Sequence, residues 1–263
     1  MPSSSVCRYE HFETDWYRRL AEKMGLVGWL HRKPWEFCII AAALEERDML
    51  GPGRRGLGFA VGKEVLSSYF AACGVDVVAT DLDPAKLEAN WLRYGQHASS
   101  LDALHHPSIV DRQTFDARVS FRTADMRKLE DSLGVGSYDF LWSACALEHL
   151  GSLRAGMDFV RNAMRFLKPG GIAVHTTEYN VGSNVKTKTR GPSVIYRRRD
   201  MEDLEYSLRH LRCGLEPIEF DAGTHHHDLN YDEPLRQVEG RTHLKLMGHG
   251  DLFTSMLIVI RKG

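Results

Sequence analysis

Apolar and polar positions follow two different periods along this chain, and each period predicts a kind of element. Over residues 9–24, apolar side chains recur at helical spacing. A second helix is predicted over residues 34–50, because Pro34 is tolerated in a first helical turn, and Gly51-Pro52-Gly53 ends it. We expect these two helices, within residues 1–53, to form an N-terminal helical lid.

Beyond residue 53, short apolar runs alternate with amphipathic stretches. Strands are predicted to end near Gly58 and to cover residues 76–81, 118–122, 138–142 and 172–176. Helices are predicted over residues 62–73, 84–92 and 152–167, whereas residues 95–117 lack clear periodicity and are expected to be a loop with a short helix. Strands joined by helices of this length form a parallel sheet that is covered on both faces.

The pattern changes after the fifth strand. A helix is predicted over residues 200–213, then a strand over 215–220, and the chain closes with an apolar run over 252–260. This order predicts an α/β domain, residues 54–263, with a seven-stranded, mostly parallel sheet and a C-terminal antiparallel hairpin. We expect the polar insertions at about 178–199 and 221–250 to close over an acceptor.

Composition narrows the possible partners. The net charge of −1 argues against nucleic acid, because phosphate binding needs a basic surface. No apolar run reaches the roughly 20 residues that span a bilayer, and the N-terminus lacks the apolar stretch of a secretory signal. The five cysteines have no CxxC spacing, which is typical of reduced thiols, so we expect a cytoplasmic protein.

The most informative stretch is the glycine-rich turn over residues 56–64. It follows a short strand and opens a helix, so backbone N–H groups can approach a polar ligand closely. The next strand stops on Asp81, whose carboxylate can accept hydrogen bonds from both hydroxyls of a ribose. Together they predict a pocket for an adenosine-containing cofactor.

Five motifs in this order and spacing resemble class I S-adenosylmethionine-dependent methyltransferases of the small-molecule type, over residues 54–171. They are the glycine turn, the acid after strand two, Asp-Met after strand three, the Leu147-Glu148-His149 signature and the Lys168-Pro169-Gly170-Gly171 turn. The resemblance implies a Rossmann-like fold and S-adenosylmethionine as cofactor. The cofactor-binding residues that it implies are Gly58, Ala60, Gly62, Asp81, Leu82, Asp125, Met126 and Ser143. A nicotinamide or flavin site is the competing interpretation of the glycine turn.

The chain departs from the family's pattern at two positions. The middle glycine is Ala60, and Gly56 stands where the family often has an acid that helps to hold the methionine ammonium group. Glu64, or a residue of the stretch 31–36, is a candidate replacement, and Arg32 or Lys33 could pair with the methionine carboxylate. Because of these departures, a non-catalytic cofactor-binding module remains an alternative.

The predicted catalytic residues are His149 and Glu178, which follow strands four and five. In the fold that the resemblance implies, both strand ends face the methyl group. We predict that His149 is the general base and that Glu178 orients it or binds a substrate hydroxyl. The structural alternative is that His149 caps the following helix and Glu178 is a loop acid.

Polar residues of the insertions are candidates for substrate binding. His225, His227 and Asn180 are predicted to contact the acceptor, and no metal is expected, because magnesium prefers oxygen ligands. The basic run over residues 196–200 is either a solvated face or a clamp for an anionic substrate. The predicted function is O-methylation of a small polar acceptor such as a sugar, nucleotide-linked sugar or glycan-precursor hydroxyl. An N- or C-methyltransferase of another metabolite is the alternative.

Overall fold

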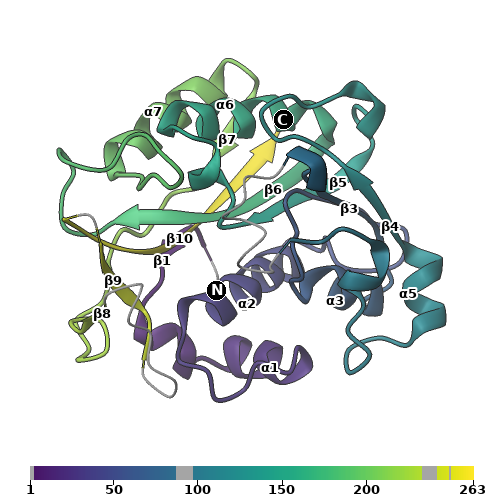
Figure 1. Cartoon of the computed structure of the whole chain (residues 1–263), viewed down its shortest axis with the longest axis horizontal. Coiled ribbons are helices and arrows are strands. Elements are labelled where there is room, and N and C mark those ends of the chain that lie inside the picture. Colours follow the sequence, from purple (N-terminus) through teal and green to yellow (C-terminus); the bar gives the residue numbers. More distant parts are fainter. Residues whose placement is uncertain (1–2, 87–96, 233–241, 249) are drawn as a thin grey trace.

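The computed structural model describes residues 3–86, 97–232, 242–248 and 250–263 (Figure 1). The strands are β1 (Ser5–Val6), β2 (Arg55–Gly58), β3 (Asp76–Asp81), β4 (Val119–Thr123), β5 (Tyr138–Ala144), β6 (Leu167–Asn180), β7 (Cys213–Leu215), β8 (Tyr231–Asp232), β9 (Lys245–Gly248) and β10 (Asp251–Lys262). The helices are α1 (Asp15–Lys23), α2 (Arg32–Glu46), α3 (Leu66–Ala72), α5 (Arg112–Arg118), α6 (Leu153–Ala163) and α7 (Arg198–Arg209). Short 3-10 helices are η1 (Tyr9–Glu13), η2 (Pro84–Lys86), η3 (Leu101–Leu104), η4 (Asp131–Leu133), η5 (Leu147–His149) and η6 (Met164–Phe166).

The strands of the described residues form one sheet, in the order β4-β3-β2-β5-β6-β10-β9-β8. The first five are parallel, and β10 is antiparallel to β6 along nearly its whole length, with Ser255 opposite Glu178. The short β7 pairs with the end of β10. The predicted fold of a mostly parallel sheet that ends in an antiparallel hairpin is therefore confirmed, and β1, β8 and β9 add short pairings at the hairpin side.

Helices cover both faces of this sheet, as Figure 1 shows. Strand β5 explains the arrangement, because its residues alternate between two cores. Phe140 and Trp142 point into the core beneath α1, α2, α3 and α5, whereas Leu141 points into the core beneath α6 and α7. No helix of the described segments has the length and apolar composition to cross a membrane.

Several element bounds differ from the prediction. The first helix is divided, because the Thr14 hydroxyl accepts from the backbone N–H of Tyr17 and caps α1 after η1. Strand β6 starts at Leu167 and runs through the predicted turn to Asn180, so Glu178 lies within a strand and not in a loop. Residues 97–117, the described part of the segment 95–117, hold η3 and most of α5, and the predicted helix at 84–92 lies mainly outside the described residues.

Helix α2 belongs to the core of the sheet. Trp35, Cys38 and Ile39 are almost completely buried and share one apolar cluster with Phe70 of α3 and Phe140 of β5. All five cysteines are free thiols. The N-terminal segment therefore supplies part of the hydrophobic interior, and the function of residues 1–53 as a lid stays a prediction.

Candidate active site

The glycine-rich turn follows β2 at the centre of the sheet. A Cβ at Gly58 would lie 2.3 Å from the Trp142 ring of the neighbouring β5, so only glycine fits there. Ala60 has a φ of 47° and Gly62 a φ of 55°, so both adopt the left-handed region. Alanine at position 60 thus keeps the backbone shape of a glycine turn, with some strain.

Asp81 at the end of β3 is bound to this turn. Its carboxylate accepts the backbone N–H of Gly62 at 3.1 Å, that of Ala98 at 3.1 Å and that of Leu82 at 2.8 Å. The Nδ1 atom of His97 lies 3.2 Å from the same carboxylate. These contacts fix a buried acid beside the glycine turn, where the sequence predicted the ribose site.

Asp125 and Met126 continue the site beyond β4. The backbone N–H of Ala124 donates to the Asp81 carbonyl at 2.8 Å, so the two strand ends are joined. Burial by itself would raise the pKa of Asp125, but hydrogen bonds from the Arg127 side chain and backbone lower it below its usual value. Asp125 is therefore an ionised acceptor next to the buried Met126 side chain.

Ser143 near the end of β5 points into the interior. Its hydroxyl lies 2.8 Å from the Nδ1 atom of His175 on β6, and both residues are fully buried. Burial lowers the pKa of His175 to about 3, so its ring is neutral. Because the Ser143 hydroxyl is already hydrogen-bonded to His175, the backbone of Ser143 would have to make any contact with the cofactor.

Glu64 lies just after the glycine turn and is almost completely buried. Its Oε1 atom accepts a hydrogen bond of 2.6 Å from the indole N–H of Trp142. Burial raises the pKa of Glu64 to about 8. The hydrogen bond from Trp142 and the charge of Lys33 lower the pKa, but their effect is smaller. The chain thus places a carboxyl group that is mostly protonated at neutral pH beside the cofactor turn.

Glu178 on β6 is bound by a residue from the other end of the chain. The Arg32 guanidinium of α2 donates to Glu178 at 3.1 Å and to the Ser255 hydroxyl of β10 at 3.1 Å. The Ser193 hydroxyl donates to the second Glu178 oxygen at 3.1 Å. Arg32 and Ser193 therefore hold the carboxylate that we predicted would orient His149 or bind a substrate hydroxyl.

His149 lies beyond β5 and contacts a different glutamate. Its Nδ1 atom is 2.9 Å from the Pro192 carbonyl oxygen, and its Nε2 atom is 4.0 Å from Oε1 of Glu148. The other Glu148 oxygen accepts from the Thr177 hydroxyl at 2.9 Å. Burial raises the pKa of Glu148. The sequence analysis missed this neighbour, although Glu148 stands beside His149 in the signature itself.

Helix α2 adds two more charged groups behind Arg32. The buried Glu36 carboxylate accepts from Arg32 at 3.3 Å, from the Lys33 ammonium at 2.9 Å and from the Ser255 hydroxyl at 2.5 Å. These partners hold the pKa of Glu36 below its usual value despite burial. The spacing of Arg32, Lys33 and Glu36 within one helical turn was the available sequence signal.

Comparisons with known proteins agree with this geometry. Residues 57–175 match the family model of a methyltransferase domain. This match begins within β2 and ends within β6, and it contains Gly58, Asp81, Asp125 and His149. No curated protein sequence matches the chain significantly.

Residues 57–175 form a class I S-adenosylmethionine-dependent methyltransferase domain. Among solved structures, a methyltransferase from Mesorhizobium loti has 16% identity and a TM-score of 0.53, and the alignment covers 84% of this chain and 96% of that one. The Burkholderia thailandensis 1,6-didemethyltoxoflavin-N1-methyltransferase, with bound S-adenosylhomocysteine, has 13% identity and a TM-score of 0.50, over 98% and 91% of the two chains. Magnesium protoporphyrin IX methyltransferase from Synechocystis has 11% identity and a TM-score of 0.50, over 97% of each chain.

The residues of the methyltransferase fit S-adenosylmethionine as the cofactor. A buried acid at the end of β3 suits the paired hydroxyls of its ribose, and Asp125 suits the polar edge of its adenine. The buried Glu64 carboxyl group follows the glycine turn, and the charge of Lys33 acts on it. When bound, the cofactor supplies an activated methyl group on its sulfonium.

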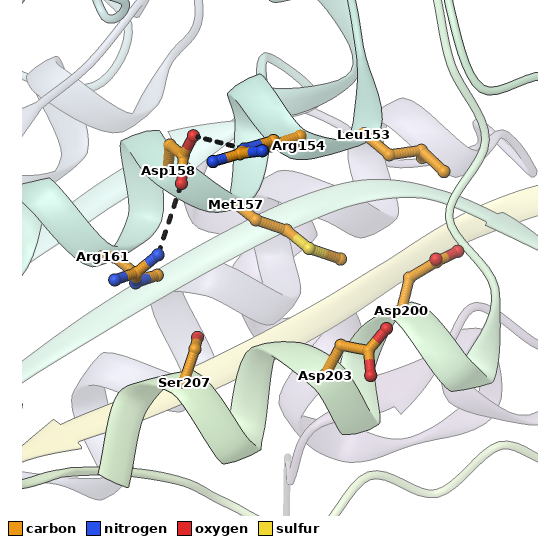
Figure 2. A pocket seen from close by; sticks show the side chains of 8 residues that line it. All are labelled: Leu153, Arg154, Met157, Asp158, Arg161, Asp200, Asp203 and Ser207. Carbon is orange, nitrogen blue, oxygen red and sulfur yellow. Dashed lines mark hydrogen bonds and ion pairs between the residues drawn. The ribbon is translucent and has the colours of Figure 1, made fainter. Parts of the chain in front are cut away.

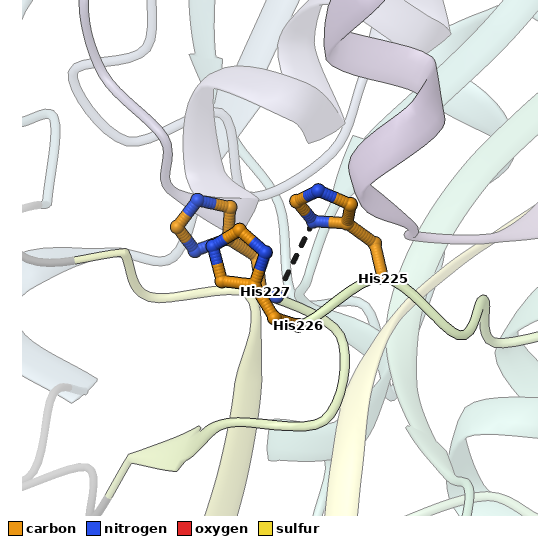
Figure 3. Close-up of side chains that lie close together, drawn as sticks. All are labelled: His225, His226 and His227. Carbon is orange, nitrogen blue, oxygen red and sulfur yellow. Dashed lines mark hydrogen bonds between the residues drawn. The ribbon is translucent and has the colours of Figure 1, made fainter.

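The predicted acceptor histidines lie in a turn near the N-terminal segment (Figure 3). The His225 ring stacks on Tyr9 with ring centroids 3.9 Å apart, and the His227 Nδ1 atom is 3.0 Å from the Thr242 hydroxyl. The ligand atoms of His225, His226 and His227 lie within 4.8 Å of one another, so the turn has donors that could hold a metal ion. Their predicted contact with the acceptor stays a prediction.

Asn180 at the end of β6 organises the following loop of the methyltransferase. Its amide nitrogen donates to the Lys186 carbonyl at 3.1 Å and to Asp251 at 2.9 Å, and its oxygen accepts from the backbone of Gly182 and Ser183. These bonds use most of the donors and acceptors of the amide. They hold the loop next to the end of β6.

A groove of the methyltransferase lies between α6 and α7 (Figure 2). Its lining residues are Leu153, Arg154, Met157, Asp158, Arg161, Asp200, Asp203 and Ser207. Asp158 pairs with Arg154 and Arg161 along α6. None of the predicted site residues lines this groove.

Proposed function

We propose that this methyltransferase transfers the methyl group of S-adenosylmethionine to a hydroxyl of a small polar acceptor, a sugar or glycan precursor, with His149 as general base. The observation that carries the proposal is the hydrogen bond of His149. A carbonyl oxygen only accepts, so Nδ1 must donate to Pro192, and in the neutral ring the lone pair lies on Nε2. Nε2 can then take the proton of an acceptor hydroxyl.

Methyl transfer to a hydroxyl is an in-line displacement in which the nucleophile must be aligned and deprotonated. Glu148 supports the second task, since its Oε1 atom is buried, has no hydrogen-bond partner among the described residues and lies 4.0 Å from Nε2 of His149. Oε1 therefore lies beside the ring nitrogen that would receive the proton. Glu178, held by Arg32 and Ser193, is a second polar contact for a hydroxyl-rich acceptor.

An acceptor amine is the second candidate, and one observation favours it. The unpartnered Glu148 oxygen lies near Glu178, whose charge also acts on Glu148. A protonated amine would balance these carboxylates, although it must lose its proton before it can be methylated. N-methylation would also use His149 as the base.

The decisive experiment is an acceptor screen with radiolabelled S-adenosylmethionine, followed by mass spectrometry of the product. The panel contains sugars, nucleotide sugars and matched amino sugars. Methylation of hydroxyls that is lost in His149→Ala supports the proposal. Turnover that occurs only on amines would replace it with the second candidate, and His149→Ala with wild-type turnover would remove the base. We also propose a cytoplasmic location, which the five free thiols support.

A further inference from the structure

The acid that the family pattern places two residues before the first glycine cannot be restored in this chain. A Cβ at Gly56 would lie 2.4 Å from the Phe140 ring, which fills that side of β2. A carboxylate for the ammonium group of the cofactor must therefore come from another element. Glu64 is the acid that follows the glycine turn most closely in sequence.

Glu64 has an unusual environment for a carboxyl group. The Trp142 indole gives it one hydrogen bond, and no ion pair with a cation is found for it within the described residues. The charged and titratable groups that face it are Lys33 and Glu36 from α2 and Asp81 from β3. The ring of His106 lies near its backbone.

Lys33 of α2 is the cation whose charge acts on Glu64. Its ammonium bonds Glu36 at 2.9 Å, yet its side chain remains 33% exposed, whereas that of Arg32 is only 12% exposed and is occupied by Glu178 and Ser255. An ammonium group has three donors, so Lys33 can keep its Glu36 bond and still reach a ligand carboxylate. Glu64 and Lys33 thus supply one acid and one cation.

We propose that Glu64 and Lys33 hold the amino-acid end of S-adenosylmethionine, Glu64 the ammonium and Lys33 the carboxylate, and that Glu64 loses a proton when the cofactor binds. The carboxyl O–H bond breaks, the proton goes to solvent, and the carboxylate forms an ion pair with the cofactor ammonium. A buried acid without a cation partner stays protonated, and a cation brought next to it favours the ionised form. Burial in the free protein raises the pKa of Glu64 to about 8, which agrees with this sequence of events.

The test compares two nucleosides by calorimetric titration at pH 7. S-adenosylhomocysteine carries the amino-acid end, and 5′-methylthioadenosine lacks it. Repeating each titration in buffers of different ionisation enthalpy counts the protons released. We expect release approaching one proton with S-adenosylhomocysteine and none with 5′-methylthioadenosine. Equal proton counts for the two ligands would overturn the proposal, even if no variant could be purified.

Variants then test whether Glu64 releases the proton and whether Lys33 pairs with the ligand carboxylate. Glu64→Gln keeps an oxygen for Trp142, so it should fold, bind S-adenosylhomocysteine about 10- to 100-fold more weakly, release no proton and bind 5′-methylthioadenosine as before. Lys33→Met should weaken only S-adenosylhomocysteine and keep the proton release. Trp142→Phe is the matched control, because it removes the hydrogen bond to Glu64 and leaves the carboxyl group. Unchanged affinity in Glu64→Gln, or equal weakening of both ligands, would contradict the proposal.

Discussion

The Phe140 ring occupies the space that any side chain at position 56 would need, since a Cβ there would lie 2.4 Å from it. The two residues face each other across paired strands, Gly56 on β2 and Phe140 on β5. The absence of an acid at position 56 is therefore a packing arrangement between two strands. It does not by itself indicate a disabled cofactor site.

Gly56→Ala should destabilise the protein by about 1–3 kcal/mol, because an extra methyl group in a close-packed core forces its neighbours to shift. Urea unfolding followed by circular dichroism measures the free energy of unfolding. Phe140→Leu in the same chain should recover part of the loss. If Gly56→Ala is as stable as wild type, the ring has room to move and the packing argument is wrong.

Asp81→Ala should weaken S-adenosylhomocysteine binding by about 1.5–3 kcal/mol, roughly 10- to 100-fold, through the loss of charged hydrogen bonds to the ribose. Calorimetric titration gives the affinity. Asp83→Asn is the matched control, because Asp83 lies two residues further on and its carboxylate, among the described residues, accepts from the backbone N–H of Ala85. Equal affinities for Asp81→Ala and wild type would show that the ribose binds elsewhere.

His149→Ala should lower kcat by about 10²–10⁴, the usual contribution of a general base. The acidic limb of the pH–rate profile should disappear with it, because that limb reports protonation of the base. The comparison is His210→Ala, which changes an exposed histidine just beyond α7 whose ring meets Tyr206 edge to face. A variant at position 149 that keeps the acidic limb would assign it to another group.

Lys245→Met should cost about 3–5 kcal/mol of unfolding free energy, because it leaves a buried charge without its partner. The Lys245 ammonium lies 2.9 Å from Asp228, and both side chains are fully buried. Adding Asp228→Asn should restore much of the stability, which a double-mutant cycle of urea denaturation would reveal. Additive losses in the double variant would mean that the two charges do not interact.

Glu64 should make the free protein less stable as pH rises from about 5 to 8. Its pKa is 4.5 for the ordinary group and about 8 in the folded state, so between these values the folded state holds one more proton than the unfolded state. The free energy of unfolding then falls with rising pH across this window and is constant above it. Below pH 4.5 both states are protonated and the loss is absent.

The buried His175 has the opposite dependence. Its pKa is lowered from 6.5 to about 3, so it favours unfolding as the pH falls below 6.5. Wild type and Glu64→Gln share this effect, and the difference between their stabilities isolates Glu64. Thermal denaturation from pH 5 to 8 should show that the stability of Glu64→Gln increases relative to that of wild type as the pH rises. Parallel curves would mean that Glu64 titrates alike in the folded and unfolded states.

The strands and the turn around the predicted cofactor site could be predicted from the sequence because the patterns that specify them are local. Strand β3 was predicted residue for residue, since an apolar run between two acids fixes both ends. Asp81 and the glycine turn were brought together as expected, because parallel strands place their carboxyl ends at one edge. Strand β6 was predicted too short, because its Thr, Glu and Tyr residues pair with β10, which lies almost 80 residues further on.

The arrangement around Glu178 and His149 depends on contacts that no local sequence pattern encodes. Arg32 and Glu178 are 146 residues apart in sequence, and their ion pair forms only because α2 packs against β6 and β10. Glu178 was predicted to orient His149 or to bind a substrate hydroxyl, because both residues follow strand ends, and that role stays a prediction. The short helix η5 sets Glu148, which was not predicted, beside the imidazole.

Arg32 and Lys33 are consecutive residues, yet Arg32 bonds Glu178 and the charge of Lys33 acts on Glu64. Under the two proposals above, one helix then carries a residue for the acceptor site and a residue for the cofactor site, so binding of the two ligands is coupled. Any rotation of α2 that relaxes the grip on one ligand also alters the grip on the other. A homologue that acquires a new acceptor by changing this helix must retain its hold on the methyl donor at the same time, which restricts the substitutions that evolution can make there.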